Sequence, residues 1–267
     1  MALTVAGSDS GGGAGLQADL RTFAAHGVFG TSVVTAVTAQ NTVAVLGVEP
    51  MTPAFVELQL EAVLSDLPVA AVKTGMLATP GTVAAVGRWA RRGDLPGLVV
   101  DPVLVASTGR PLLDGDGVRA YLEHLLPHAV LVTPNVREAA LLTGMAVDDV
   151  EGMGRAALAL ARLGPGMVVV KGGHLGGAVA PDVVVGGDEV LVLEEPRVPS
   201  GNDHGSGCTL AAATAARLAR GEELLAALEG AKDYVTAALA GSASWRLGAG
   251  HGPLDHFGWG PVPPSTA

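Results

Sequence analysis

The chain has 267 residues, of which 49% are hydrophobic, and this is enough for one large α/β domain with a sizeable core. Its 16 basic and 26 acidic residues leave a net charge of −10, and only 3% of its residues are aromatic, so we expect no nucleic-acid partner. One cysteine cannot form an internal disulfide, and the uncharged run 22–48 is broken by glycine and amide residues. We therefore expect a cytoplasmic protein without a membrane span.

Short β-branched runs alternate with longer alanine- and leucine-rich segments of helical period, which is typical of βαβ units and a buried, mainly parallel sheet. The predicted elements in chain order are strand 3–6, helix 15–25, strand 32–36, helix 53–67, strand 70–73, helix 80–92, strand 98–101, helix 118–125, strand 129–133, helices 137–143 and 149–163, strand 167–171, and helices 207–220 and 223–240. Between the last strand and helix 207–220, segments 182–185 and 190–193 predict an antiparallel hairpin at the sheet edge.

Two helix starts carry the same signal, because Thr52 precedes Pro53 and Thr79 precedes Pro80. A threonine hydroxyl caps the helix and proline fits its first turn. The sequence has no internal repeat and no linker, which predicts a single domain over residues 1–257. The proline-containing tail 258–267 is expected to be loosely held.

A first glycine loop, residues 11–15, follows the first predicted strand and opens the first helix. Gly13, Gly15 and Ala18 satisfy the relaxed dinucleotide-binding pattern, but no acidic residue lies between Asp19 and Glu49 to bind a ribose. No G-x-x-x-x-G-K-[ST] sequence occurs either, which excludes a P-loop. The glycines indicate either close backbone approach to a small molecule or a tight turn.

A second glycine loop, Gly205, Ser206, Gly207 and Cys208, leads directly into a predicted helix. Backbone N–H groups at a helix N-terminus carry partial positive charge, so this turn is suited to hold a phosphoryl group. In the first turn the pKa of the Cys208 thiol is expected to fall, which would let the thiolate accept a proton. The alternative is that Cys208 is a small buried hydrophobic residue.

These loops belong to a series of segments that together resemble the hydroxymethylpyrimidine/phosphomethylpyrimidine kinases of thiamine biosynthesis, in the ribokinase-like superfamily. The segments are AGSDSGGGAGLQAD at 6–19, TAQNT at 38–42, VKTGM at 72–76, DPV at 101–103, TPNVRE at 133–138, KGGH at 171–174, HGSGCT at 204–209, AKDY at 231–234 and GHGPLDH at 250–256. The resemblance covers about 250 residues and implies a three-layer α/β/α fold with a mainly parallel sheet. It also implies a homodimer.

The resemblance further implies ATP and Mg²⁺ as cofactors. Residues 205–208 would form an anion hole, with Cys208 in the place of the usual aspartate base. Lys171, Asn135 and Lys232 would contact the nucleotide. Asn135 and Glu138, three residues apart at a helix start, would hold Mg²⁺ through its water shell, and Asp101 would contribute to the metal site.

For the acceptor, Gln40 resembles the family position that hydrogen-bonds the aminopyrimidine edge, since an amide offers both a donor and an acceptor. The remaining residues implied to line the acceptor pocket are Gly7, Ala14, Asp19, Met76 and Val103. Met76 and Val103 are equally compatible with core positions. The chain departs from the family at Asp203 and Ser206, where threonine is usual.

The predicted activity is phosphorylation of hydroxymethylpyrimidine and of its monophosphate. The nearest alternative is a pyridoxal kinase, because that ring also carries a hydroxymethyl group. A non-catalytic nucleotide-binding sensor on the same scaffold and a dinucleotide oxidoreductase are alternatives of other classes. Cys208, Asn135, Glu138 and Lys171 argue against the sensor, and the missing ribose acid argues against the oxidoreductase.

Overall fold

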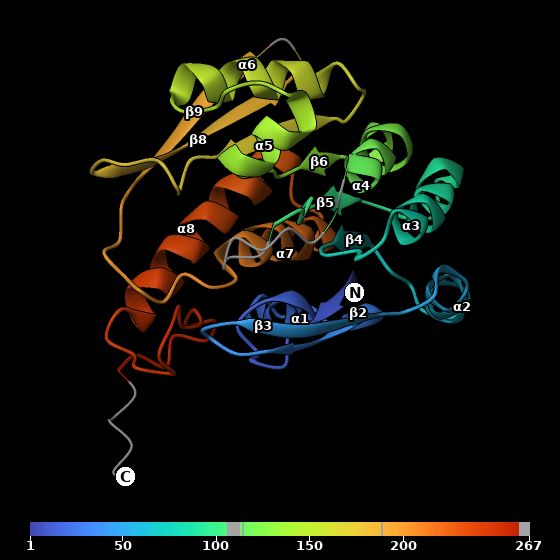
Figure 1. Ribbon diagram of the computed structural model, residues 1–267, viewed down its shortest axis with the longest axis horizontal. Coiled ribbons are helices and arrows are strands. Elements are labelled where there is room, and N and C mark those ends of the chain that lie inside the picture. Colours follow the sequence, from blue (N-terminus) through green and yellow to red (C-terminus); the bar gives the residue numbers. More distant parts are fainter. Residues whose placement is uncertain (106–112, 114, 188, 262–267) are drawn as a thin grey trace.

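A single sheet with helices on both faces organises the chain, as the computed structural model in Figure 1 shows for residues 1–105, 113, 115–187 and 189–261. The strands are β1 (Ala2–Ser8), β2 (Gly30–Gln40), β3 (Val45–Pro50), β4 (Ala71–Thr74), β5 (Val99–Val100), β6 (Leu131–Val132), β7 (Met167–Lys171), β8 (Val179–Gly186) and β9 (Glu189–Pro196). The helices are α1 (Gly15–Ala25), α2 (Pro53–Leu64), α3 (Pro80–Arg92), α4 (Gly115–Ala120), the π-helical turn η1 (Tyr121–Leu125), the 3-10 turn η2 (Leu126–His128), α5 (Val136–Thr143), α6 (Val150–Ala161), α7 (Ser206–Ala219) and α8 (Leu224–Ser242).

The strand order is β3-β2-β1-β4-β5-β6-β7-β8-β9. The six strands from β2 to β7 are parallel, whereas β3 at one edge and the β8–β9 hairpin at the other are antiparallel to their neighbours. This confirms the predicted mainly parallel sheet with an edge hairpin. The carboxyl ends of the parallel strands share one edge of the sheet, which is where ligands bind in open α/β folds.

Alternate residues of the strands face two separate cores, as the pleat requires. In β7, Val168 and Val170 pack into the core covered by α2, α3, α5 and α6, while Val169 packs into the core covered by α1, α7 and α8. Figure 1 shows α7, in orange, beside β4, although it follows much later in the chain. The start of α7 is thereby brought near the ends of the early strands.

The structure corrects several predicted boundaries. Strand β3 was not predicted, because Gly47 and Pro50 weaken its strand propensity; an edge strand tolerates both. Strand β2 continues to Gln40, beyond the predicted end at residue 36. Helix α2 ends at Leu64, before the predicted residue 67, because the following Pro68 disfavours helical backbone in the residue before it.

The capping predictions are confirmed, since the hydroxyls of Thr52 and Thr79 accept from the N–H groups of Phe55 and Thr82. At the other end of the chain, Trp245 Nε1 donates to the carbonyl of Gly260 at 2.7 Å, so the start of the predicted tail is hydrogen-bonded. Residues 262–267 of that tail lie outside the described residues, as does Asp188 of the hairpin turn. No helix in the described part of the chain is both long enough and apolar enough to cross a bilayer.

Candidate active site

The predicted anion hole, residues 205–208, lies at the N-terminus of α7. Gly205 is its N-cap residue, with a left-handed φ of 88°, and the helix starts at Ser206. Residues 205–208 are half-buried, and the N–H of Ser206 donates to the carbonyl of Asp203 at 3.1 Å. Because the N–H groups of the first turn lack partners within the helix, the turn can bind an anion.

The two glycine loops pack directly against each other. The Asp9 carboxylate organises the first loop by accepting from the N–H groups of Gly11, Gly13 and Ala14 at 2.8, 3.1 and 2.9 Å. A Cβ atom on Gly13 would overlap the ring of His204, and one on Gly205 would overlap the carbonyl oxygen of Gly13. The first loop is therefore a turn whose glycines permit close contact with the anion hole.

Gly205→Ala is expected to lower kcat/KM for ATP on the order of 100-fold, because misplacing the helix start by about 1 Å is enough for such a loss. The added Cβ would both meet Gly13 and occupy a left-handed backbone conformation. Gly201→Ala is the matched control, since a Cβ there has no neighbour within 4 Å. Steady-state kinetics with varied ATP measure both; equal activities would show that the turn does not bind the nucleotide.

Lys171, at the end of β7, faces the anion hole. Its Nζ lies 2.9 Å from Asp101 Oδ1 and also 2.9 Å from the position that a Cβ on Gly207 would take. Burial alone would lower the pKa of Lys171, but the carboxylates of Asp101 and Glu138 raise it, so the ammonium stays charged. The structure thus brings a positive charge next to the helix N-terminus, as predicted.

Asn135 and Glu138 form a capping box at the start of α5. The Asn135 side chain accepts from the N–H groups of Arg137 and Glu138, and Glu138 Oε2 accepts from the N–H of Asn135 at 2.9 Å. Burial raises the pKa of Glu138 to about 7. The Lys171 ammonium acts to lower this pKa, and the Asp101 carboxylate acts to raise it further. Within the described residues no three His, Cys, Asp or Glu side chains form a metal-binding group. Two carboxylates, from Asp101 and Glu138, are nevertheless present beside the anion hole.

The predicted lowering of the Cys208 pKa is wrong. Burial raises the pKa of this thiol to about 12. The Lys73 ammonium and the N–H of Gly15 lower the pKa, but by less than burial raises it. The helix N-terminus is favourable, but desolvation of a thiolate outweighs it. Cys208 is therefore a protonated thiol at neutral pH in the ligand-free chain. A direct part for it in the reaction stays a prediction.

Asp19 does not line the acceptor pocket. Its carboxylate is fully buried, 2.8 and 2.9 Å from Lys73 Nζ and 2.6 Å from the hydroxyl of Thr4. Its partner Lys73 is also fully buried. Burial alone would lower the pKa of Lys73, but the Asp19 charge raises this pKa by more than burial lowers it. The pair lies beneath Cys208 and supports the site from inside.

Of the other predicted acceptor residues, Gln40, Gly7 and Ala14 lie beside the glycine loops, whereas Val103 follows β5, two residues after Asp101. Gln40 ends β2, where its backbone N–H and C=O bond the hydroxyl of Ser10 at 2.8 and 2.7 Å. Met76 and Val103 are half-buried, and Gly7 lies under Met76, whose Cε occupies the place of a Cβ on Gly7. Half-buried Ala14 precedes α1 as its N-cap. The side-chain amide of Gln40 contacts His204, which directly precedes the anion hole.

Lys232, on α8, has its ammonium in a buried ion pair. Its Nζ lies 2.7 Å from Asp182 Oδ2 on β8, and the other oxygen of Asp182 accepts from the N–H of Gly172, next to Lys171. Lys232 therefore supports the turn after β7. Direct contact of Lys232 with the nucleotide remains a prediction.

The C-terminal segment, residues 248–256, contacts both ends of the second glycine loop and the residues that follow β2. The N–H of His204 donates to the carbonyl of Gly252, and the Thr209 hydroxyl lies 3.0 Å from His256 Nε2. The same segment reaches the acceptor side, where the N–H of Gly250 donates to the Thr42 hydroxyl at 3.2 Å. Asp203, at the position where the family usually has threonine, forms a 2.6 Å ion pair with His251 of this segment.

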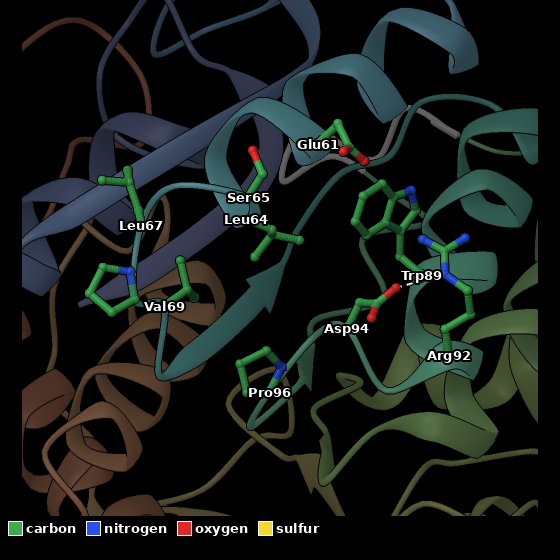
Figure 2. A pocket seen from close by; sticks show the side chains of 10 residues that line it. Glu61, Leu64, Ser65, Leu67, Val69, Trp89, Arg92, Asp94 and Pro96 are labelled. Atoms are coloured by element: carbon green, nitrogen blue, oxygen red, sulfur yellow. Dashed lines mark hydrogen bonds and ion pairs between the residues drawn. The ribbon is translucent and has the colours of Figure 1, made fainter.

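A separate cavity of 380 Å³ lies away from this site (Figure 2). Its lining comes from the ends of α2 and α3 and the segments that lead into β4 and β5, so it opens at the amino ends of these strands. Trp89, Arg92 and Asp94 are among the side chains that Figure 2 places around it. We assign no part in the chemistry to this cavity, because the loops, the lysine and the carboxylates meet at the opposite edge.

Sequence motifs alone did not identify roles for Asp9, His204 and Lys73. All three stand inside the segments that carry the family resemblance, directly beside glycines or a strand end. For Lys73, the available signal was a charged residue that follows the apolar pair Ala71 and Val72 in a buried strand.

Comparison with known proteins places the chain among vitamin kinases. The family described as phosphomethylpyrimidine kinase matches residues 9–255. A hydroxymethylpyrimidine/phosphomethylpyrimidine kinase of Rhizobium meliloti is 51% identical over 96% of this chain and 97% of its own length. The crystal structure of a phosphomethylpyrimidine kinase from Clostridium difficile is 40% identical, with a TM-score of 0.78, over 88% of this chain and 97% of that one. A Staphylococcus aureus pyridoxal kinase, solved with AMP-PCP and pyridoxal, is 34% identical with a TM-score of 0.88, over 97% and 93% of the two chains.

Proposed function

This chain belongs to the phosphomethylpyrimidine kinase family, and from that premise we propose that it phosphorylates 4-amino-5-hydroxymethyl-2-methylpyrimidine and then the resulting monophosphate, with MgATP as donor. The observation that carries the proposal is the contact between Gln40 and His204. It brings the residue expected to bind the acceptor ring next to the anion hole expected to bind the phosphoryl group.

Positioning and charge neutralisation supply the rate in this proposal, as is general for phosphoryl transfer. The N–H groups of residues 205–208 hold the transferring group, and the Lys171 ammonium neutralises charge that spreads over its oxygens. Gln40, Met76 and Val103 orient the acceptor ring so that its hydroxyl oxygen is in line with the leaving oxygen.

The chain has residues that suit Mg²⁺. This ion keeps several waters and needs only one or two protein carboxylates besides substrate phosphates. Asp101 and Glu138 fit that requirement. Burial and the nearby Asp101 charge disfavour the ionised form of Glu138, and a bound cation would favour it by neutralising the two negative charges. When bound, the ion would neutralise phosphate charge and fix the phosphate orientation.

Turnover measured with MgATP and three acceptors tests the proposal. We expect ADP formation with hydroxymethylpyrimidine and with its monophosphate, and at least a roughly 10-fold lower kcat/KM with pyridoxal, the cost of about one mismatched hydrogen bond. Nucleotide binding without turnover of any of the three would favour a sensor and contradict the proposal.

The second candidate is a pyridoxal kinase, which the backbone similarity to the Staphylococcus aureus enzyme favours. Higher sequence identity to the pyrimidine kinases favours the first candidate. A higher kcat/KM with pyridoxal than with either pyrimidine would establish the second.

Cys208→Ser is expected to reduce turnover of the alcohol and of the monophosphate by similar factors, because the thiol is protonated at neutral pH. Only the alcohol must lose a proton during attack, so a catalytic base would affect that step alone. Single-turnover assays from pH 6 to 9 measure both reactions. Two results together would show that the thiolate is the base. The variant would lose rate only with the alcohol, and the rate with the alcohol would rise with pH in the wild type but not in the variant.

The homodimer and the cytoplasmic location also remain proposals. Light scattering after size exclusion measures the first, and fractionation of the source cells measures the second.

A further inference from the structure

His204 stands between the two halves of the proposed site. Its Nε2 atom lies 2.9 Å from Asp9 Oδ2 and 3.2 Å from the side-chain amide nitrogen, Nε2, of Gln40. The side chains of His204 and Asp9 are only 10% and 4% exposed, so water cannot easily replace either contact. One ring nitrogen thus faces both a carboxylate and the amide that is proposed to hydrogen-bond the acceptor ring.

The carboxylate decides which atom carries the proton. Burial acts to raise the pKa of Asp9, but its hydrogen bonds with His204, Ala14 and Gly11 lower it overall. Asp9 is therefore ionised and can only accept hydrogen bonds. It follows that Nε2 of His204 bears a hydrogen that points toward Asp9, and that this nitrogen has no lone pair to offer.

The proton on Nε2 in turn decides how the Gln40 amide is turned. The structure places the NH₂ group of Gln40 toward His204, but two donors would then confront each other. Turning the amide by 180° about its last side-chain bond removes this conflict and puts the oxygen on His204. Its oxygen can share the Nε2 hydrogen with Asp9, and the two ends of an amide are nearly the same size, so either orientation packs equally well. Hydrogen bonding alone therefore selects the orientation with the oxygen on His204.

We propose that His204, held by Asp9, is a positioning residue that keeps the Gln40 oxygen on its own ring and the Gln40 NH₂ group toward the acceptor. Gln40 then selects an acceptor atom that itself accepts a hydrogen bond, such as an unprotonated ring nitrogen. The exocyclic amino group of the acceptor is not its partner. This inference rests on the proposed function in one respect, which is that Gln40 contacts the acceptor ring.

The proton on His204 can be tested without any substrate. The ¹⁵N chemical shifts of the His204 ring in the wild-type protein distinguish a protonated from an unprotonated Nε2. We expect a protonated Nε2 that loses its distinct shift in Asp9→Asn. An unprotonated Nε2 in the wild type would overturn the proposal whatever the enzyme phosphorylates, so this outcome is separate from failure of the proposed function.

The orientation of Gln40 is tested with two acceptor analogues, one without the exocyclic amino group and one with C–H in place of the neighbouring ring nitrogen. We expect wild-type KM to rise roughly 10-fold more for the second analogue, the equivalent of one hydrogen bond. In His204→Leu this difference should disappear and KM for the normal acceptor should rise by a similar factor, while KM for ATP is retained. His204→Gln, which keeps an N–H donor near the place of Nε2, should restore the difference.

A double-mutant cycle separates positioning from a general structural role. If His204 acts through Gln40, His204→Leu should have no further effect on acceptor KM in a Gln40→Ala background. Additive effects would overturn the proposal, as would unchanged analogue preference in His204→Leu. If His204→Leu does not fold, His204→Gln and Asp9→Asn supply the comparison, with the ¹⁵N shifts as the deciding measurement.

Discussion

Lys171→Met is expected to lower kcat by about 10²–10³ with both acceptors, the usual effect of removing one group that stabilises developing charge. The ammonium is next to Gly207 in the anion hole, and methionine keeps a similar length without the charge. The loss should be the same for the alcohol and the monophosphate, because the transferring group is the same in both reactions. Single-turnover kinetics with saturating ATP measure it.

Lys232→Met is the matched control for this experiment. Both lysines form buried ion pairs with an aspartate, at 2.9 and 2.7 Å, so their loss should disturb folding to a comparable degree. Only Lys171 faces the anion hole. Similar kinetic losses in the two variants would mean that Lys171 acts through stability or that Lys232 also contacts the nucleotide, and calorimetric titration of ATP separates these explanations.

Lys73→Met is expected to lower the free energy of unfolding by about 3–5 kcal/mol, because it leaves the Asp19 carboxylate buried without its counter-charge. Both side chains are 0% exposed, so the loss should not depend on salt concentration. Because the Asp19 charge raises the pKa of Lys73, the contribution of the ammonium is complete below about pH 10 and is lost only at higher pH. Burial raises the pKa of Asp19, so the pair is also lost at low pH when this carboxylate takes up a proton. Urea unfolding measures the change.

Lys73→Met combined with Asp19→Leu should recover most of this loss, since a buried pair can be replaced by apolar residues at little cost. The exposed pair of Arg88 and Glu57 provides the comparison, and its removal should change stability by about 0–1 kcal/mol. A loss near 1 kcal/mol for Lys73→Met would show that Asp19 accepts a proton when it is left alone.

Local signals in the sequence predict most of the fold. The bounds of α1 and α3 are the predicted ones, because a glycine-rich turn and a Thr-Pro pair mark their starts. The mainly parallel sheet follows from the β-branched runs. Strand β3 could not be predicted from local signals, because Gly47 and Pro50 both disfavour strands. Its stability comes from pairing with β2, which is a contact that the local sequence does not reveal.

Sequence motifs suggested candidate site residues, but not the contacts between them. A glycine-rich helix start predicts an anion hole wherever it occurs, and α7 has one at Gly205. The direction of the Cys208 pKa depends on how much the rest of the chain buries the thiol, and this is a tertiary property. Asp19 pairs with Lys73, 54 residues later, so its removal from the pocket could not be inferred from either motif.

The C-terminal segment has a consequence for how the enzyme is made. Gly252 and His256 hold the loop that begins α7, and Gly250 holds Thr42 beside the acceptor residue Gln40. A growing polypeptide on the ribosome can pair its central strands early, but these contacts to His204, Thr209 and Thr42 form only after residues 250–256 have been made. Chains that stop before residue 250 should therefore retain most of the sheet but lack catalytic competence.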